Sequence, residues 1–292
     1  MIYIVGSLNM DLVVETPYMP KEGETLTGSG FFTNCGGKGA NQAVAAAKLG
    51  GKVAMCGAVG NDEFGLRQLS GLQSVGVDVS HIKTISGVSS GIAIIVVCNG
   101  NNRIILDKGA NNTVCEQDID NFLAGAKSGD VYLTQLENPV DVIGYGLKVA
   151  KKKGMTTILN PAPANLQIES YFEFVDYITP NETELALFGG KQALFAKGIK
   201  RIVTTLGGDG YEIADVNGAK KYPCHKVKVV DTTSAGDTLC GGLAVGLSEG
   251  QTLEQSCAFG SKAATIACMA KGAQQSIPTR KQVEEFVFES VE

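Results

Sequence analysis

The strongest constraint on the fold is the regular alternation of two kinds of segment after residue 112. Short apolar runs, each typical of a buried strand, are separated by longer segments with the apolar spacing of a helix. Strands that alternate with helices favour an α/β fold, in which a mostly parallel central sheet is covered by helices on both faces. The expected strands are 130–134, 156–159, 177–179 and 201–205, and the expected helices are 116–126, 139–152, one from Asn181, 235–247, 253–270 and 279–288.

The first part of the chain follows this rhythm with two interruptions. The segments that fit are a strand at 2–5, an Ala-rich helix at 39–49, a strand at 52–58 and a helix at 63–75 capped by Asn61 or Asp62. The segments that do not fit are short strands at 11–15, 24–27, 91–98 and 103–107, the last two joined as a hairpin by a turn at 99–102. We interpret residues 1–292 as a single α/β domain whose pieces 11–30 and 91–107 form a small β-sheet lid.

Charge and hydropathy argue against two classes of partner. The net charge is −5 and no run of Lys or Arg is longer than three residues, whereas nucleic-acid-binding proteins normally carry a basic patch. The longest apolar runs, 92–98 and 263–270, are far shorter than the ~20 residues that cross a bilayer. The N-terminus also lacks the charged segment of a signal peptide. We expect a cytoplasmic protein without a nucleic-acid or membrane partner.

The eight cysteines do not predict a metal site. No Cys-x-x-Cys pair occurs, and the chain has two histidines, His81 and His225, whereas zinc sites use closely spaced Cys and His ligands. Reduced and mostly buried thiols are expected, because free Cys packs as a small hydrophobic residue.

Polar residues follow several predicted strands, and open α/β sheets bind their ligands at the carboxyl ends of the strands. Asn9 and Asp11 follow the first strand, and two residues apart in an extended chain they face the same side. A carboxylate beside an amide suits a polyol, whose hydroxyls donate to the first and exchange hydrogen bonds with the second. The alternative is an Asx-type turn that leads into the next strand.

A glycine-rich segment, CGGKGANQ at 35–42, opens the next helix. Its glycines allow the backbone to approach a ligand closely, and a helix start favours negative or hydroxyl-rich groups. No Ser or Thr follows Lys38, so the segment is not a Walker A loop, and Gln42 breaks the G-x-G-x-x-G pattern. A plain turn with a helix cap is the alternative.

Two more segments follow later strands. Asn181 and Glu184 are spaced as a capping box, although Glu184 is equally suited to a hydrated Mg²⁺. Residues 231–238, DTTSAGDT, place small residues at a helix start, where backbone N–H groups bind anions such as phosphate. Asp237 would repel that anion unless a substrate hydroxyl lies between them. Alternatively, Asp237 only complements the helix dipole. The turn TTLGGDG at 204–210 is a weaker candidate on its own.

The chain resembles the ribokinase family of carbohydrate kinases through motifs in this order: GSLNMD (6–11), CGGKGANQ (35–42), TPNETE (179–184), TTLGGDG (204–210) and DTTSAGDT (231–238). The resemblance continues through QLENP (135–139), LNPAPA (159–164) and KGAQQSIP (271–278), so that it covers essentially the whole chain. It implies transfer of the γ-phosphoryl group of ATP to the 5-hydroxyl of D-ribose, with ATP, Mg²⁺ and K⁺ as cofactors.

The resemblance also implies roles for the matching residues. Asp237 would be the general base, and the backbone N–H groups around Ser234, Ala235 and Gly236 would stabilise the transferring phosphoryl group. The implied sugar ligands are Asn9, Asp11, Gly37, Lys38, Asn41, Glu137 and Asp237. The implied nucleotide contacts are Asn181, Thr205, Gly207, Gly208, Gly210 and Ser261. Glu184 would help to position Mg²⁺. A K⁺ ion would be held, mainly through carbonyl oxygens, by Asp231, Thr233, Ala267, Ala270, Gly272 and Ser276.

Two positions depart from the family pattern: Ser234 replaces a more usual Gly, and Ser261 stands where Asn or His is common. The family often builds a homodimer through the lid sheet, which is therefore expected here.

Several functions compete with a ribose kinase. Asn9, Asp11, Asn41 and Glu137 together favour ribose, but a kinase of the same family for 2-deoxyribose, tagatose, fructose or a nucleoside remains an alternative. A sugar sensor without catalytic activity is disfavoured by Asp237. An oxidoreductase that uses a dinucleotide would need G-x-G-x-x-G after the first strand, and GSLNMD does not match it.

Overall fold

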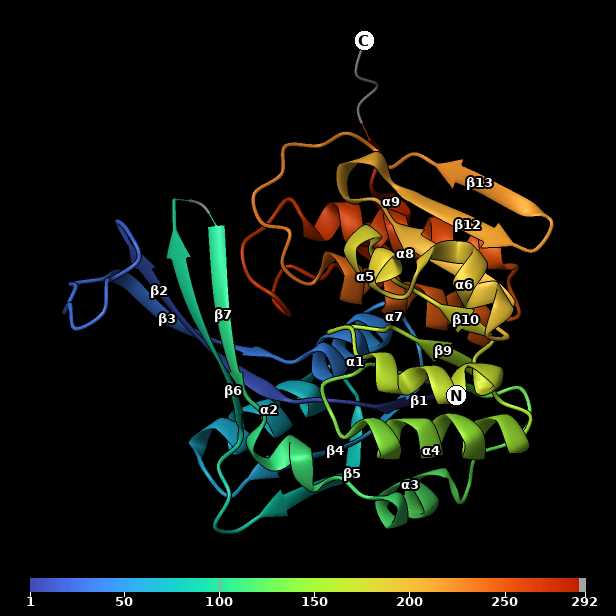
Figure 1. The fold of residues 1–292 in the computed structure, drawn as a ribbon, viewed down its shortest axis with the longest axis horizontal. Helices are drawn as coiled ribbons and strands as arrows, with labels where there is room; N and C mark the ends of the chain where they lie inside the picture. The colour runs from blue at the N-terminus through green and yellow to red at the C-terminus, as the bar shows by residue number, and fades with distance from the viewer. Residues whose placement is uncertain (100, 289–292) are drawn as a thin grey trace.

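The computed structural model describes residues 1–99 and 101–288 and contains one large and one small sheet (Figure 1). The large sheet consists of β1 (Ile2–Val5), β4 (Val53–Gly60), β5 (Asp78–Ile85), β8 (Val131–Thr134), β9 (Thr156–Leu159), β10 (Tyr177–Ile178), β11 (Arg201–Thr205), β12 (Tyr211–Asp215) and β13 (Gly218–Tyr222). Its order is β13-β12-β11-β10-β9-β8-β1-β4-β5. Neighbours from β5 to β11 are parallel, and β12 and β13 are antiparallel at one edge. The predicted α/β fold is confirmed.

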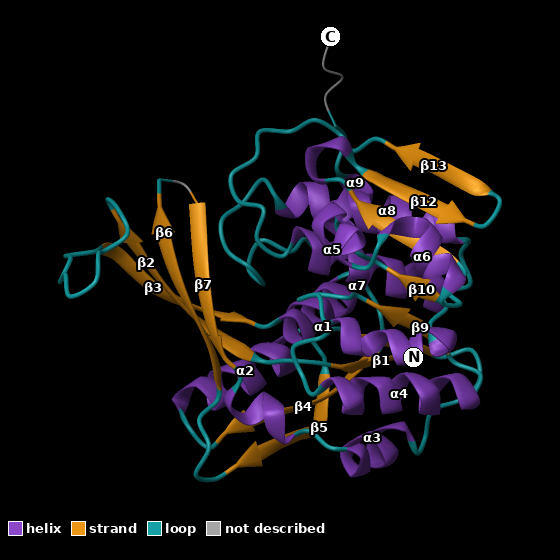
Figure 2. Cartoon of the chain, in the orientation of Figure 1, coloured by secondary structure: helices purple, strands orange, loops and turns teal. Residues whose placement is uncertain are grey.

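Helices cover both faces of the large sheet, which gives it two apolar cores (Figure 2). One face carries α1 (Lys38–Lys48), α2 (Glu63–Ser74), α7 (Ala235–Ser248), α8 (Leu253–Ala267) and α9 (Arg280–Glu285), and the other carries α3 (Glu116–Leu123), α4 (Val140–Lys152), α5 (Glu182–Leu187) and α6 (Gly190–Ala196). Successive strand residues point to opposite faces, so Ile4 belongs to the first core and Val5 to the second. In the described part of the chain, no helix combines the length and the apolar character needed to cross a bilayer.

The small sheet is the predicted lid, with one strand placed differently. It contains β2 (Asn9–Thr16), β3 (Ser29–Gly36), β6 (Gly91–Cys98) and β7 (Asn101–Asp107) in the order β3-β2-β6-β7. It projects from the body at the left of Figure 1. The strand predicted at 24–27 is wrong, because Glu24 binds Tyr18 Oη (2.5 Å) and Lys21 N (2.9 Å) and thereby closes a loop before β3. The lid is not wholly antiparallel, since β2 and β6 pair in parallel. Residue 100 of the predicted turn lies outside the described residues.

The strands of the large sheet that were not predicted are β5, β12 and β13. β5 and β13 lie at the two edges of the large sheet, and their half-exposed, polar sequences lack the apolar runs of the inner strands. The helices predicted at 116–126, 253–270 and 279–288 end earlier, at residues 123, 267 and 285. The cap before α2 is Asp62, whose Oδ1 accepts from Gly65 N at 2.8 Å. All eight cysteines are described and free of disulfides, as expected.

The order of strands places a crevice beside β1. From β1 the chain passes through α1 to β4 on one side, whereas from β8 it passes through α4 to β9 on the other. Connections that leave neighbouring strands in opposite directions open a crevice at their carboxyl ends, where open α/β sheets bind ligands. A ligand site is therefore expected among the residues that follow β1 and β8.

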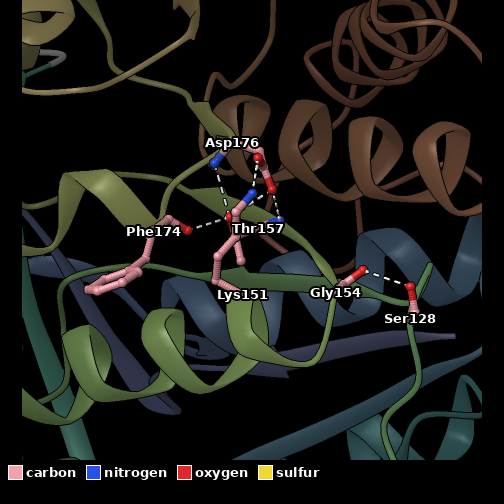
Figure 3. A network of polar contacts seen from close by, with 6 residues as sticks. All are labelled: Ser128, Lys151, Gly154, Thr157, Phe174 and Asp176. Atoms are coloured by element: carbon pink, nitrogen blue, oxygen red, sulfur yellow. Dashed lines mark hydrogen bonds and ion pairs between the residues drawn. The ribbon is translucent and has the colours of Figure 1, made fainter.

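A separate polar network ties together the opposite, amino-terminal ends of β9 and β10 (Figure 3). Asp176 precedes β10, pairs with Lys151 Nζ at the end of α4, and accepts from Thr157 N at 3.0 Å. Asp176 N in turn donates to Thr157 Oγ1 at 2.9 Å. This network joins a helix end to two strands and lies away from the crevice, so we interpret it as structural.

Candidate active site

The glycine-rich segment before α1 packs against the end of β1. Ala40 N donates to Ser7 O at 2.9 Å. A Cβ on Gly39 would lie 2.5 Å from the carbonyl carbon of Gly6, and one on Gly37, where φ is +89°, would lie 2.7 Å from Asn9 N. These glycines are therefore required for contact between two parts of the chain, which is a different reason from the close ligand approach that the sequence suggested.

A buried carboxylate, Glu137, follows β8 and bonds to residues that follow β1. Its Oε2 accepts from Ser7 Oγ, from Asn9 Nδ2 at 3.3 Å and from Lys38 N at 3.1 Å. Asn111, which follows the lid strand β7, holds the Asn9 amide by donating to Asn9 Oδ1 at 2.8 Å. Among the described residues no donor reaches Glu137 Oε1, which leaves that oxygen as an acceptor for a ligand.

The second carboxylate, Asp237, lies in the first turn of α7 and is held by two amides of α1. Asn41 Nδ2 donates to Asp237 Oδ2 at 3.1 Å, and Gln42 Nε2 donates to Asp237 Oδ1 at 3.0 Å. Asn41 Nδ2 also lies 3.0 Å from Ser234 Oγ. The sequence separates these residues by nearly two hundred positions, and the fold brings them into direct contact.

Three acidic side chains face one ammonium group in this crevice. Burial raises the pKa of Asp11 to about 7, and the negative charges of Glu137 and Asp237 add to that effect. Burial alone would lower the pKa of Lys38, but Asp237, Glu137 and Glu184 outweigh it, so the pKa is raised and Lys38 stays charged. The site thus combines a charged ammonium group with carboxylates that retain free acceptor positions, an arrangement that favours a ligand rich in hydroxyl groups.

Two adjoining cavities lie beside these groups. The larger, of about 450 Å³, is lined by every predicted nucleotide contact: Asn181, Thr205, Gly207, Gly208, Gly210 and Ser261. The smaller, of about 280 Å³, is lined by the predicted catalytic loop together with Lys38 and Glu184, the loop residues being Ser234, Ala235, Gly236 and Asp237. Asn181, Thr205, Thr232, Ala235 and Gly236 line both cavities. A ligand that fills both would pass over the N-terminus of α7.

The start of α7 offers backbone donors to that ligand. Ala235 N donates to Thr232 O at 3.2 Å, and the first bond of the helix itself is Thr238 N to Ser234 O at 2.8 Å. No acceptor within the described residues takes the N–H groups of Gly236 and Asp237, and unpaired donors at a helix start bind anions. Ser234 has a φ of +61°, a left-handed conformation that explains why glycine is the easier residue at this position.

Asp231 joins two of the segments that carry the predicted K⁺ ligands. Asp231 Oδ1 accepts from Thr233 N at 2.9 Å and Oδ2 accepts from Gly272 N at 3.0 Å, so Asp231 joins the two loops. Burial on its own would raise the pKa of Asp231, but the bonds from Thr233 and Gly272 outweigh it and lower the pKa. Ala270 N donates to Ala267 O at 3.2 Å, whereas Ser276 Oγ donates to Ala273 O within its own turn.

Glu184 adopts the capping-box geometry that was one of its two interpretations. Its Oε2 accepts from Asn181 N at 2.9 Å, and Asn181 Oδ1 accepts from Glu184 N at 2.8 Å. Burial raises its pKa, the bond from Asn181 and the charge of Lys38 oppose that rise, and Asp237 adds to it. Across residues 1–99 and 101–288, no group of three or more His, Cys, Asp or Glu side chains could enclose a metal ion.

Several residues around Asp237 were not assigned a role from the sequence. Gln42, Gln135 and Asn160 are connected to Asp237 by hydrogen bonds, and Thr179 and Cys240 line the smaller cavity. A usable signal existed for the first three, because each is a polar residue directly after a strand or at a helix start.

A model of the "pfkB family carbohydrate kinase" matches residues 1–280. The chain belongs to the pfkB family of carbohydrate kinases. Among curated members of the family, a ribokinase of Haemophilus influenzae is 38% identical over 297 residues, which cover 97% of each chain. A deoxyribokinase of Salmonella typhi is 35% identical over 300 residues, which cover 98% of each chain.

Solved structures of the family share the fold. Ribokinase from Thermotoga maritima superimposes with a TM-score of 0.86 at 36% identity, covering 97% of this chain and 98% of that one. Arabidopsis thaliana ribokinase complexed with ribose and ATP superimposes with a TM-score of 0.86 at 31% identity, covering 98% and 99%. This pfkB-family chain is thus an ATP-dependent carbohydrate kinase by descent as well as by fold.

Proposed function

We propose that the protein transfers the γ-phosphoryl group of ATP to the 5-hydroxyl of D-ribose, giving ribose 5-phosphate and ADP. One observation carries the proposal: the Asp237 carboxylate and the start of α7 lie where a cavity lined by all the expected nucleotide residues adjoins the carboxylate-rich crevice. The relatives named ribokinase, and the similarity to a structure of one with ribose and ATP, support it.

The sugar lies among Asn9, Asp11, Gly37, Lys38, Asn41 and Glu137. Glu137 Oε1 and the Asp11 carboxylate accept hydrogen bonds from its hydroxyls. Bonds to ionised acceptors are about twice as strong as neutral ones. They also offset the burial that, with the charges of Glu137 and Asp237, raises the pKa of Asp11 in the free protein.

Asp237 accepts the proton of the 5-hydroxyl as that oxygen attacks the γ-phosphorus. A carboxylate is a weak base toward a hydroxyl group. Phosphoryl transfer tolerates a weak base, because its loose transition state depends mainly on positioning and charge neutralisation. The N–H groups of Gly236 and Asp237 supply part of that neutralisation.

Mg²⁺ and K⁺ are part of the proposal, and the donors present fit both. Without an acidic cluster among the described residues, Mg²⁺ would be held mainly by nucleotide phosphates and water, and Glu184 would help to position it. Mg²⁺ neutralises phosphate charge when bound. Asp231, which accepts from the backbone N–H groups of Thr233 and Gly272, would offer carboxylate oxygen to a monovalent cation that prefers hard oxygen ligands.

A 2-deoxyribose kinase is the second candidate, because a relative of nearly equal similarity is a deoxyribokinase. The two sugars differ by one hydroxyl. A site built to bond that hydroxyl rejects the analogue by factors of about 10⁴–10⁵, since a buried polar group is left unpaired. The number of acceptors around Asp11 and Glu137 therefore favours ribose.

We also propose a homodimer formed through the lid, one domain spanning residues 1–292, and a cytoplasmic location. The lid exposes large apolar side chains for which solvent is a poor partner: Phe31, Phe32, Ile94, Ile104, Ile105 and Leu106.

Both cores pack on a single sheet, which supports one domain. Eight free thiols suit a reducing compartment.

An ADP-release assay with ribose, 2-deoxyribose, fructose and adenosine, each with and without K⁺, tests the proposal. Turnover on ribose and little on the others is expected. Asp237→Ala is expected to lower kcat by about 10²–10⁴ and to change the KM for ribose by no more than a few-fold. Weaker ribose binding with normal kcat in Asp237→Ala would contradict the role of Asp237, and preferred turnover on 2-deoxyribose would select the second candidate.

A further inference from the structure

A row of buried amides leads from the end of β8 to Asp237. Gln135, the first residue after β8, donates through Nε2 to Gln42 Oε1 at 2.6 Å. Gln42 Nε2 then donates to Asp237 Oδ1 at 3.0 Å and to Asn160 Oδ1 at 3.2 Å. Gln42 and Gln135 are almost fully buried, and neither lines the two cavities described above.

The row has only one satisfactory orientation. If the Gln42 amide were reversed, its oxygen would face the oxygens of Asp237 and Asn160, and its NH₂ group would face the NH₂ group of Gln135. Because Gln135 donates to Gln42 Oε1, it selects the orientation in which both N–H bonds of Gln42 point to acceptors. Gln135 thus acts on Asp237 only through Gln42.

The backbone is shaped to admit this row. A Cβ on Gly6 would lie 2.3 Å from Gln135 Oε1, so the chain needs glycine at the end of β1 to make room for the amide. Gln135 Oε1 is buried without a hydrogen-bond partner in the described part of the chain. A buried acceptor without a donor is costly. The hydrogen bond that Gln135 Nε2 donates to Gln42 offsets that cost.

We propose that Gln42, oriented by Gln135, is a positioning residue that keeps Asp237 ionised and turned toward the attacking hydroxyl. With Gln42 on Oδ1 and Asn41 on Oδ2, each carboxylate oxygen retains one free acceptor direction for a substrate. Asn41 and Gln42 both direct N–H groups at the Asp237 carboxylate, and N–H donors stabilise its ionised form. The inference rests on the proposed role of Asp237 as the base.

The test must account for the other ionisable groups around Asp237. These groups are Asp11 of β2, Lys38 at the start of α1, Glu184 of α5 and the buried thiol of Cys240 on α7. None of them is altered in the variants below, so a change in pH dependence between variants reports on the row itself.

The experiment compares kcat against pH for wild type, Gln42→Leu, Gln135→Leu and the double variant. In Gln42→Leu the ionised carboxylate loses one donor, so the acidic limb of the profile is expected to move up by about one pH unit, with a KM for ribose within about three-fold. Gln135→Leu is expected to give a smaller shift in the same direction. The double variant is expected to match Gln42→Leu, because Gln135 has no other route to Asp237.

Gln68→Leu is the matched control for loss of a buried glutamine. Gln68 donates to the backbone oxygens of Asn9 and Gly36 and not to Asp237, so the acidic limb is expected to stay in place whatever happens to KM. An unmoved limb in Gln42→Leu, or additive shifts in the double variant, would overturn the inference and leave only a structural role for the row.

A titration separates this inference from the proposed function. The ¹³C carboxyl signal of residue 237, assigned by its loss in Asp237→Asn, is followed against pH in the folded protein without substrate. Its midpoint is expected to rise in Gln42→Leu. If Asp237→Asn retains turnover, the proposed base is wrong, yet the titration still tests the row. If Asp237→Asn is inactive and the midpoint does not move, the positioning role alone fails.

Discussion

Replacing Asp11 with asparagine is expected to stabilise the free protein, and to do so increasingly as the pH rises. Burial, with the charges of Glu137 and Asp237, raises the pKa of Asp11 from its ordinary value of 3.8 to about 7. Between these two values the folded chain keeps a proton on Asp11 that the unfolded chain has released. The free energy of unfolding therefore falls as the pH rises through this window.

The size of the effect follows from the width of the window. Each pH unit corresponds to ~1.36 kcal/mol, so the full interval would give ~4 kcal/mol. Asp11 is partly open to solvent, which screens the charges, and we expect ~1–2 kcal/mol in practice. The asparagine side chain of the variant cannot ionise, so Asp11→Asn does not lose this stability at high pH.

Urea unfolding at pH 4.5, 6 and 8 without ligands measures the prediction. The difference between Asp11→Asn and wild type in free energy of unfolding is expected to be small at pH 4.5 and to reach its full value at pH 8. Glu22→Gln, which removes an exposed carboxyl from the loop before β3, is the control and is expected to give no trend. An Asp11→Asn difference that is the same at every pH, or that becomes negative at pH 8, would refute the reasoning.

Three further changes probe the backbone and the sugar pocket. Ser234→Gly is expected to raise the free energy of unfolding by ~0.5–1 kcal/mol by removing the strain of a positive φ, and thermal melts would contradict this if the glycine variant were less stable than wild type. Gly37→Ala places a Cβ 2.7 Å from Asn9 N at a φ of +89°, so we expect a loss of at least ~2 kcal/mol in denaturant titrations. Asn111→Asp replaces the donor to Leu8 O and Asn9 Oδ1 by an acceptor, and the KM for ribose is expected to rise at least ~10-fold with a smaller change in kcat; an unchanged KM would contradict the role of Asn111 in holding Asn9.

The inner strands and the candidate site residues that follow them could be predicted from the sequence, because their signals are local. Apolar runs such as Ile2–Val5 mark strands, and polar residues that follow them mark the crevice. The spacing of Asn181 and Glu184 indicated the capping box that the structure contains. Small residues before Asp237 predicted a helix start beside a cavity.

Other parts depend on contacts that no local pattern encodes. β5 and β13 are polar edge strands, recognisable only once the neighbouring strand is in place. Gln42 reaches Asp237 across 195 positions, and Gln135 reaches Gln42 across 93. The sequence shows that these glutamines are polar, but only the fold shows which groups they contact.

A residue of the proposed sugar pocket, Asn9, is also a residue of the lid. Asn9 is the first residue of β2, pairs with Gly36 at the end of β3 and with Gly91 at the start of β6, and donates to the Glu137 carboxylate. Any tilt of the small sheet would therefore move Asn9, which belongs to the proposed sugar pocket.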